Sequence, residues 1–483
     1  MSATYQKFTK DILTVGGARI IVALSGIILL PLITKHLGAY DYGIWSQFSV
    51  TIGLLWTLSN LGLPLAMSRF LAAIEDKEQI REQFYSVLVL VFIISAVISS
   101  LLVVFPGPFA RAFFGGATQA ITIIGGIVLL SSLYQVCLTF FRAFRHMKIY
   151  SIFLVADTYV QLGIIVYLVS SGHGIIAMLL AVLVTRAVTL LILFLLIKAR
   201  IGIKSPRFSR IKEYLRFGVP AVPGGISSWV VGSSDRYVIA YFMGASAVGV
   251  YSAAYALGSL IIMAAGIFTF VLPPTLAKLF DEGRLDEVKT HLRYSLKYLL
   301  ALAIPFVFGA GILSIPVLRM FSTAEIASQG YFVMPLVALS TLAYVAYTPL
   351  VQPLLLVKKT KILGVIWVVS ALTNLGLNIL LVPRLGILGA AVPTLIAYGL
   401  ALGLTGYYSH REFSFAIDWR FIAKSLLAST IMSVVIWRMA PQGTSDTIVT
   451  AVAGAGIYGA ALLLLKGLNR EELGFFRSLF QRG

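Results

Sequence analysis

The sequence predicts an all-α, polytopic membrane protein with 14 transmembrane helices: two six-helix lobes in a parallel pseudo-two-fold repeat plus two extra C-terminal helices. Three observations predict this fold class: the apolar composition, the alternation of basic residues and an internal repeat. Hydrophobic residues are 59% of the 483 residues and charged residues are 12%, whereas an ordinary soluble domain carries about 25% charged residues. With a mean hydropathy of +0.93, a soluble fold would expose large apolar patches to water. Helical spans satisfy their own backbone hydrogen bonds in lipid and are therefore expected.

Fourteen apolar runs are long enough to cross a bilayer, which takes about 20 residues of helix. They are centred near residues 23, 56, 93, 129, 160, 186, 229, 259, 304, 343, 372, 398, 428 and 456. The shortest separations, 170–174 and 382–386, must be breaks, because merging either pair would make a helix far too long. Residues 1–11 are polar, and the run after them is long enough to remain as a first span, so we expect no cleaved signal peptide.

Basic residues alternate between the two sides of the predicted membrane. If the N-terminus is cytoplasmic, 30 of the 38 Lys and Arg residues fall in cytoplasmic segments and six in outer loops. Only Arg19 and Arg186 lie inside spans by this count. An excess of Lys and Arg in cytoplasmic loops is the usual topology signal, so we expect both termini in the cytoplasm. The segment from Lys198 to Arg216 holds seven basic residues, which we interpret as a topology signal in contact with lipid headgroups.

The same topology explains the net charge of +19, so we expect no nucleic-acid partner. Cys137 is the one cysteine and lies in an apolar run, which excludes a disulfide framework and a cysteine-ligated metal site. The five histidines are scattered without the spacing of metal ligands. We therefore expect neither a metal ion nor a cofactor.

An internal repeat relates two parts of the chain. Residues 38–46 read GAYDYGIWS and residues 244–252 read GASAVGVYS, at an offset of 206. Two further matches follow in the same order, Leu63-Pro64 with Arg69 on Leu272-Pro273 with Lys278 (offset 209) and residues 145–149 on 358–362 (offset 213). The copies are six spans apart and so have the same orientation. This predicts two lobes related by an axis along the membrane normal, with a substrate site between them near the midplane.

The repeat divides the chain into an N-lobe at residues 1–200 (spans 1–6), a basic cytoplasmic linker at 201–215 and a C-lobe at 216–411 (spans 7–12). Residues 412–483 hold spans 13 and 14 and a cytoplasmic tail. Glycine and proline are concentrated in the spans that open each lobe, at Gly16, Gly17, Gly26 and Pro31 and at Pro220, Pro223, Gly224 and Gly225. Such residues bend helices, so we expect bends in the first and seventh spans. The alternative is that Gly and Pro are simply common in membrane helices.

Two stretches resemble a known family of transporters. Asp235-Arg236-Tyr237-Val238 … Gly244 … Gly249-Val250-Tyr251-Ser252-Ala253-Ala254-Tyr255 resembles the start of the C-lobe in polysaccharide flippases, and Gly38 … Tyr42-Gly43-Ile44-Trp45 with Gly62 … Arg69 resembles the N-lobe. The arrangement of motifs, the duplication and the two extra helices are similar over essentially the whole chain. The resemblance is to the polysaccharide transporters and lipid-linked oligosaccharide (O-antigen-type) flippases of the multidrug/oligosaccharidyl-lipid/polysaccharide (MOP) exporter superfamily.

The resemblance implies a flippase of the cell membrane that works by alternating access. Its substrate would be an oligosaccharide joined through a phosphate or diphosphate to a polyprenol, moved from the cytoplasmic to the outer leaflet for surface polysaccharide or glycoconjugate synthesis. It also implies a central cavity for the headgroup. The glycan and the energy source, including a coupling ion such as H⁺ or Na⁺, are left open.

Five charged residues are predicted within or at the end of a span: Arg19 in the first, Asp157 in the fifth, Arg186 in the sixth, and Asp235 and Arg236 toward the outer end of the seventh, where Arg236 is counted with the outer loop. A charge in hydrocarbon costs roughly 2.5–3.5 kcal/mol on insertion scales, so each is a candidate for function. Arginine binds phosphate through a fork of donors, and Arg19 is the predicted phosphate ligand. The alternative for Arg19 is an interlobe or headgroup-facing side chain.

For Arg186 and Asp157 the alternatives are substrate contacts or a structural ion pair between the fifth and sixth spans. Asp235 and Arg236 are adjacent and about 100° apart on a helix, so we expect them not to face each other and to find separate partners. Asp235 has a further alternative as a proton or sodium site.

Uncharged polar residues in the spans suit sugar hydroxyls. Gln161 lies one turn from Asp157 and shares its helix face, and the repeat places it on Asn374. We predict substrate contacts from Gln161, Asn374 and Asn60. Further candidates are Gln47, Gln135 and Asn378, with Trp56 and Trp229 as surfaces for sugar rings. The alternative for all of these is packing and hydrogen bonding between helices.

Two other classes of membrane protein are alternatives, an enzyme and a multidrug exporter. A membrane enzyme would gather acid and base groups at an interface, but the acidic residues of the predicted outer loops are Asp41, Glu325 and Asp446, and no Gly-x-x-x-x-Gly-Lys-[Ser/Thr] motif occurs. We predict that the chain is not an enzyme. The nearer alternative is a cation-coupled multidrug (MATE-like) exporter, which should present carboxylates to its cavity. The embedded charges, two acidic and three basic, favour an anionic substrate.

Overall fold

The computed structural model describes residues 3–468 and residue 472, with side chains from residue 14 onward except those of residues 267, 270 and 271. In this part of the chain the secondary structure is helical and contains no strand, as the composition predicts. Of the predicted cytoplasmic tail, residues 469–471 and 473–483 lie outside the described residues.

The chain divides by its contacts into two compact units, Met1–Ser252 with Trp367–Ala390, and Ala253–Ile366 with Ala391–Gly483. These units cut across the predicted lobes, whose boundaries stay a prediction. In chain order the first helices are α1 (Ala3–Asn60), α2 (Leu63–Phe70), α3 (Lys77–Val104), α4 (Pro106–Phe113), α5 (Thr118–Ala143), α6 (Met147–Ser170), α7 (Ile175–Ile201), α8 (Ile211–Gly218), α9 (Val222–Met243) and α10 (Ala245–Gly258), with short 3-10 turns at Leu71–Ala73 and Val219–Ala221. The remaining helices are α11 (Ile262–Asp281), α12 (Leu285–Ile312), α13 (Ser314–Phe321), α14 (Ala324–Gly330), α15 (Val333–Leu350), α16 (Gln352–Leu356), α17 (Thr360–Leu385), α18 (Leu388–Glu412), α19 (Trp419–Met439) and α20 (Thr444–Leu464).

Within the described residues, eleven helices are long and apolar enough to cross a membrane. The first of these is a single stretch, Thr14–Asn60, that carries the first two predicted spans. Of the other predicted centres, residue 259 falls in the short break between α10 and α11, and the rest fall inside helices. The predicted break at 170–174 is confirmed by the end of α6 at Ser170 and the start of α7 at Ile175. The count of fourteen spans stays a prediction.

Glycine sets the turn inside α1. Gly38 has φ 82° and ψ −174°, and the rest of α1 keeps helical angles. Gly244, between α9 and α10, has φ 85° and ψ 178°. Essentially only glycine adopts this region of backbone space. Because the two glycines are 206 residues apart, the repeat seen in the sequence is also a repeat of backbone conformation.

The turns bring the repeated segments into direct contact. A methyl group built on Gly43 would lie 1.9 Å from the carbonyl oxygen of Ala245, and one built on Gly249 would lie 1.9 Å from that of Ala39. Ser46 donates its hydroxyl to Ser252 at 2.7 Å. Each of these residues thus contacts the residue 206 positions away in the chain, or one within a helical turn of it. The contact is reciprocal, as expected for helices crossing at a pseudo-two-fold axis.

The predicted bends of the first and seventh spans are not where the sequence placed them. Gly16, Gly17, Gly26 and Pro31 keep helical backbone angles inside α1, and the break comes later, at Gly38. In the seventh span, Pro220 lies in the 3-10 turn before α9 and Pro223 in its first turn. Proline is tolerated there because the first N–H groups of a helix have no intrahelical acceptor. These residues therefore mark where α9 begins.

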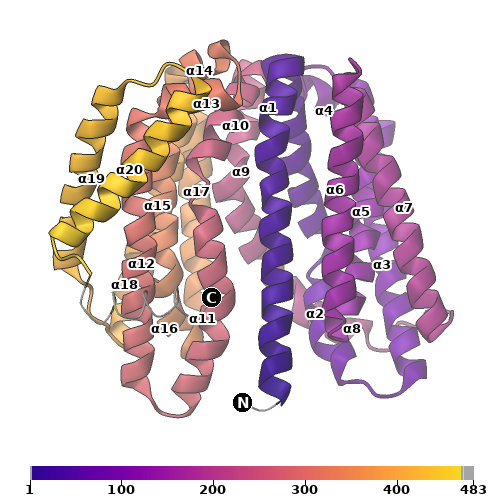
Figure 1. The fold of residues 1–483 in the computed structure, drawn as a ribbon. Helices are drawn as coiled ribbons and strands as arrows, with labels where there is room; N and C mark the ends of the chain where they lie inside the picture. The colour runs from indigo at the N-terminus through magenta and orange to yellow at the C-terminus, as the bar shows by residue number, and fades with distance from the viewer. Residues whose placement is uncertain (1–2, 469–471, 473–483) are drawn as a thin grey trace. The chain divides into compact units, whose positions relative to one another are not determined.

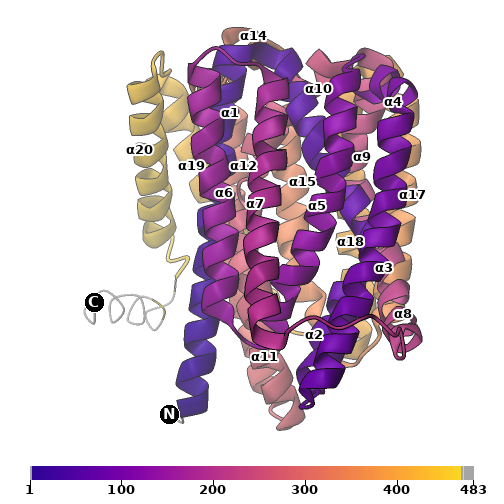
Figure 2. The same cartoon turned by 90° about the vertical axis from the view of Figure 1, so that its right-hand side faces the viewer.

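Helices α3, α5, α6 and α7 pack side by side, and α6 also lies along α1 (Figures 1 and 2). In the second unit α12 packs on α15 and α19, and α19 on α20 (Figure 2). Helices α1, α6 and α7 carry Arg19, Asp157 and Arg186, which are considered below.

The linker predicted as a lipid-facing loop is attached to the start of α3. The Glu82 carboxylate accepts hydrogen bonds from the backbone N–H of Ser209 at 3.3 Å and from its hydroxyl at 3.0 Å. Lys204 pairs with Glu78 at 2.9 Å. Tyr214 in α8 donates its hydroxyl to Gln83, and burial raises the pKa of Tyr214 so that the phenol keeps its proton. Part of the basic linker is thus held by protein side chains.

Candidate functional site

Asp157 and Arg186 form an ion pair between α6 and α7. The Asp157 carboxylate is buried, and its Oδ2 lies 3.0 Å from Nη1 of Arg186. Thr189, one turn further along α7, donates its hydroxyl to Asp157 Oδ1 at 2.9 Å. The Arg186 guanidinium lies 4.3 Å from the centroid of the Tyr134 ring on α5. The pair therefore connects three helices, and the predicted structural ion pair is present.

Asp235 and Arg236 face each other, so the expectation that they find separate partners was wrong. Arg236 Nη1 lies 2.9 Å from Asp235 Oδ1 and also donates to the carbonyl oxygen of Gly232 at 2.9 Å. The second oxygen of Asp235 accepts from the hydroxyl of Tyr251. The 100° rule describes Cα–Cβ directions, whereas the long arginine side chain turns back toward its own helix. Asp235 has no exposed surface, and this pairing neutralises its charge.

Asn374 and Asn378 on α17 extend this polar cluster. Ser234, next to Asp235, donates to Asn374 Oδ1 at 3.3 Å, and Asn378 donates to the same oxygen at 3.1 Å. Both asparagines are completely buried. Asn374 Nδ2, Asn378 Oδ1 and the hydroxyl of Ser370 have no hydrogen-bond partner among the described residues. Buried polar atoms are normally satisfied by protein, water or a ligand, so this cluster has spare donors and acceptors.

Arg19 differs from the other embedded charges because it has no partner among the described side chains. It lies on an exposed face of α1 and makes no hydrogen bond or ion pair with the described side chains. The position of α1 is set by α6, where Tyr159 donates to the carbonyl oxygen of Ile21 at 2.8 Å. Ala18, beside Arg19, is buried in the described structure. An exposed cation on an apolar helix is a natural contact for an anionic group.

The structure does not join the remaining candidates to these clusters. Gln161 and Gln135 are half-buried, without a hydrogen bond among the described residues. Asn60 donates to the carbonyl oxygen of Trp56 one turn earlier at 2.9 Å. Gln47 is 1% exposed and neither of its side-chain polar atoms has a described partner.

The two tryptophans predicted as surfaces for sugar rings differ. Trp229 donates its indole N–H to the carbonyl oxygen of Val50 at 2.9 Å and packs between α9 and α1. Its placement matches the packing alternative. Trp56 is 38% exposed and is still available for such a contact.

Sequence reasoning missed four partners of these clusters: Thr189, which donates to Asp157, Tyr134, whose ring lies against Arg186, Tyr251, which donates to Asp235, and Ser234, which donates to Asn374. Tyr251 stands in the repeated motif at 244–252, which was a signal for it. Thr189 lies three residues after Arg186, a spacing that puts both on one helix face. No group of three or more His, Cys, Asp or Glu side chains that could hold a metal ion occurs in the described part of the chain.

These features define a class, a multi-pass helical membrane protein built on a duplicated motif with paired charges inside its helices. The sequence model described as "Polysaccharide biosynthesis protein" matches residues 8–280, which is more than half of the chain, and the MatE model matches residues 220–380. The chain belongs to the polysaccharide biosynthesis protein family of the MOP superfamily.

Two curated relatives come from Haloferax volcanii. The chain is 28% identical to the "Probable flippase AglR" over 51% of its own length and 52% of that protein, so the match spans about half of AglR. It is 22% identical to the "Probable low-salt glycan biosynthesis flippase Agl15" over 83% of the chain and 84% of the relative.

Solved structures share the fold. "Lipid II flippase MurJ, inward closed conformation" has a TM-score of 0.73 at 18% identity, covering 96% of this chain and 98% of that one. An inward-facing MATE-family multidrug transporter has a TM-score of 0.64 at 14% identity, covering 83% and 97%. At these identities the likeness concerns the fold, and both branches of the superfamily have it.

Proposed function

We propose that the protein is a flippase that moves a polyprenyl-phosphate- or polyprenyl-diphosphate-linked oligosaccharide from the cytoplasmic to the outer leaflet by alternating access. The family, the flippase function named for AglR and Agl15 and the fold shared with MurJ support this proposal. Both termini are proposed to be cytoplasmic, as the distribution of basic residues indicates. The membrane is proposed to be the cell membrane, as the resemblance to the family implies. We propose that the protein transports its substrate without making or breaking covalent bonds.

The observation that carries the proposal is the state of the embedded charges. Asp157 and Asp235 are each neutralised by an arginine, at 3.0 Å and 2.9 Å, whereas Arg19 is exposed and unpaired among the described side chains. An unpaired arginine inside a span is costly, and a ligand phosphate would offset that cost through charge-assisted hydrogen bonds. We propose that Arg19 binds the substrate phosphate and that Asp157 and Arg186 position α6 and α7.

In this proposal, buried and half-buried amide side chains supply contacts for the sugars of the substrate. Asn374, Gln161 and Asn60 are kept as sugar ligands, since amide groups pair with hydroxyls both as donors and as acceptors. We propose that the coupling ion, H⁺ or Na⁺, binds to Asp235, whose carboxylate is completely buried. An ion there competes with Nη1 of Arg236, so ion binding would release the arginine.

The multidrug alternative is disfavoured by the same pairing. A site for cationic drugs needs a carboxylate free to meet them, and Asp157 and Asp235 already have arginine partners. The match of the MatE model to residues 220–380 reflects shared ancestry of the fold.

Flipping of a fluorescent lipid-linked oligosaccharide in proteoliposomes tests the proposal. We expect Arg19→Ala to lower the rate about ten- to hundred-fold, because a hydrogen bond to a charged group contributes about 1.5–3 kcal/mol. Arg19→Lys keeps the charge and should retain part of the activity. Arg438→Ala, an exposed position at the end of α19, is the matched control and should flip at the wild-type rate.

Two results would overturn the assignment. If Arg19→Ala flips the lipid at the wild-type rate and is as thermally stable as the wild-type protein, Arg19 is not the phosphate ligand. If the wild-type protein does not flip the lipid but exchanges protons for a cationic dye, the protein is a multidrug exporter and not a flippase. Mass spectrometry of lipids that co-purify in mild detergent should show a polyprenyl phosphate or diphosphate carrying sugars, and it identifies the glycan.

A further inference from the structure

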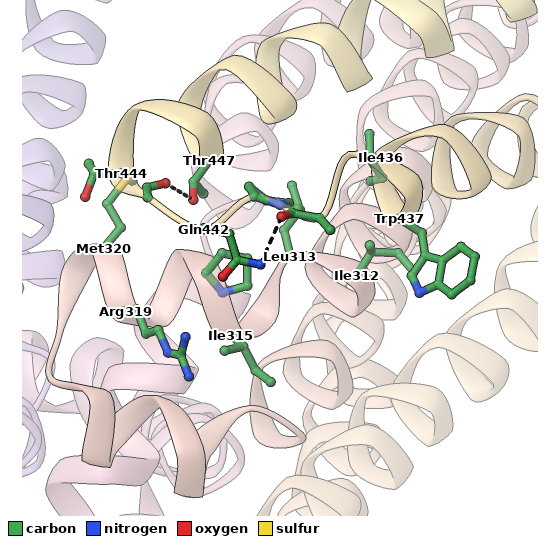
Figure 3. A pocket seen from close by; sticks show the side chains of 14 residues that line it. Ile312, Leu313, Ile315, Arg319, Met320, Ile436, Trp437, Gln442, Thr444 and Thr447 are labelled. Atoms are coloured by element: carbon green, nitrogen blue, oxygen red, sulfur yellow. Dashed lines mark hydrogen bonds between the residues drawn. The ribbon is translucent and has the colours of Figure 1, made fainter.

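A groove of about 400 Å³ lies between the α12–α13 turn and the α19–α20 loop (Figure 3). One wall is made by Ile312, Leu313 and Ile315, and the other by Ile436 and Trp437. The side chains of these two walls are apolar, whereas the loop between α19 and α20, which closes one end, and the start of α20 add polar groups such as Gln442 and Thr444. Every residue of the groove belongs to the second unit of the chain.

The loop is held in a shape that keeps the groove open. Ala440 ends α19 with a left-handed backbone, φ 40° and ψ 60°, and Pro441 follows. Gln442 donates weakly to the carbonyl oxygen of Ala440 at 3.4 Å. Thr447, which is 2% exposed, donates to the carbonyl oxygen of Gly443 at 2.7 Å and fixes the start of α20 (Figure 3).

Arg319, in the last turn of α13, is the charged residue among the 14 that line the groove. Its side chain is exposed and has no hydrogen bond or ion pair with the described residues. An unpaired guanidinium beside apolar walls offers a fork of donors to a phosphate and a surface to a hydrocarbon chain. Asp446, exposed in the first turn of α20 next to the groove, carries the opposite charge.

The groove adjoins surface that suits lipid. On α19, Leu427 is 51% exposed, Val434 54% and Trp437 67%, and on α20 Val449 is 60% and Val452 68% exposed. Such apolar surface on membrane helices faces acyl chains, and tryptophan is enriched at the membrane–water boundary. The groove therefore lies where the lipid-facing side of α19 ends.

We propose that this groove binds the headgroup of an anionic phospholipid of the outer leaflet, with the phosphate on Arg319 and the start of the chains on the apolar walls. The assignment to the outer leaflet rests on the orientation given with the proposed function. A lipid bound there would hold the outer ends of α12, α13, α19 and α20 together.

Lipid binding to the purified full chain, followed by native mass spectrometry in detergent, tests the proposal. We expect the wild-type protein to bind phosphatidylglycerol more tightly than phosphatidylcholine. Arg319→Gln should bind phosphatidylglycerol about ten-fold more weakly and lose the preference, because one charge-assisted contact is removed. Arg438→Gln removes the same charge outside the groove and should keep the preference, whereas Asp446→Asn should strengthen binding of phosphatidylglycerol.

Three outcomes would overturn the proposal. The first is that Arg319→Gln binds phosphatidylglycerol as tightly as the wild-type protein does. The second is an equal loss in Arg438→Gln, which would indicate unspecific attraction between charges. The third is displacement of phosphatidylglycerol by inorganic phosphate at low concentration, which would make the groove a site for a soluble phosphate. If Arg319→Gln unfolds at a lower temperature, Ile315→Trp, which fills the groove from an exposed position, should lower binding of both lipids.

Failure of this proposal and failure of the proposed function are distinguishable. Arg19→Ala should lose flipping and keep its preference for phosphatidylglycerol. The orientation is tested separately by labelling Thr444→Cys in intact cells with a membrane-impermeant maleimide. The native Cys137 is buried and should not react. Labelling only after the membrane is opened would place the groove on the cytoplasmic side and overturn the outer-leaflet assignment.

Discussion

At the scale of single residues, neighbouring charges on a helix pair more readily than a helical wheel suggests. Asp235 and Arg236 point their Cβ atoms in different directions, yet Nη1 of the arginine reaches the aspartate at 2.9 Å. Three methylene groups separate the Arg236 guanidinium from its Cα, and inside an apolar protein an unpaired charge is expensive. Whether the two charges pair therefore depends on the length of the arginine side chain and on the burial of both groups. For Asp157 and Arg186, on different helices, sequence could name the pair but not choose it over a substrate contact.

Gly43 and Gly249 are predicted to tolerate no side chain. A Cβ on either residue would lie 1.9 Å from a backbone carbonyl oxygen, so the two segments must separate. We expect Gly43→Ala and Gly249→Ala to destabilise the protein by about 1–3 kcal/mol, the usual cost of overpacking. Thermal unfolding in detergent measures this.

The matched control for these substitutions is Gly26→Ala in α1. A Cβ on Gly26 meets nothing within 4 Å, and alanine favours helix more than glycine does. Gly26→Ala should leave the unfolding temperature unchanged or raise it. Equal stability of all three variants would contradict the close crossing.

At the scale of elements, the turn between predicted spans depends on one residue. The sequence shows two apolar runs centred near 23 and 56, but their separation is a single glycine, Gly38, within one helix assignment. Apolar periodicity predicts that a helix exists, while a one-residue break with positive φ leaves almost no compositional trace. The repeated glycine at 244 was the usable signal, since an equivalent position with the same residue indicates the same backbone need.

The ion pair between α6 and α7 is predicted to act as a unit. Asp157→Asn or Arg186→Gln should each destabilise the protein by about 3–5 kcal/mol, because removing one partner leaves a buried charge uncompensated. The double variant should lose less than the sum of the two single losses. Thermal unfolding of the four proteins, compared as a double-mutant cycle, measures the coupling. Strict additivity would mean that the two charges do not interact.

At the scale of the whole molecule, the repeat places corresponding residues against each other. Ser46 and Ser252 share a hydrogen bond of 2.7 Å across the crossing of α1 and α10, and both are buried. If the lobes move relative to each other during transport, as proposed, this contact must loosen in some part of the cycle. The crossing is therefore the place where motion can be blocked covalently.

A disulfide between Ser46→Cys and Ser252→Cys is predicted to stop flipping. The oxygens are close enough for two thiols to replace them within disulfide reach, and the native Cys137 is buried and free. We expect the oxidised double variant to lose transport in proteoliposomes and a reductant to restore it. The single variants should transport with or without oxidant. Full transport by the cross-linked protein would show that this crossing stays closed throughout the cycle.

The sequence by itself determined the fold class, the positions of the long apolar helices and the repeat, because these depend on apolar runs and on residues such as glycine that have special backbone needs. It also identified the embedded charges, since a charge in an apolar run is costly wherever it lies. Only the tertiary structure decided which of them are paired, that Arg19 is exposed, that the linker is attached to α3, and that Arg319 lines a groove. These features depend on which side chains from distant segments come within a few ångströms, and local sequence carries no record of that distance.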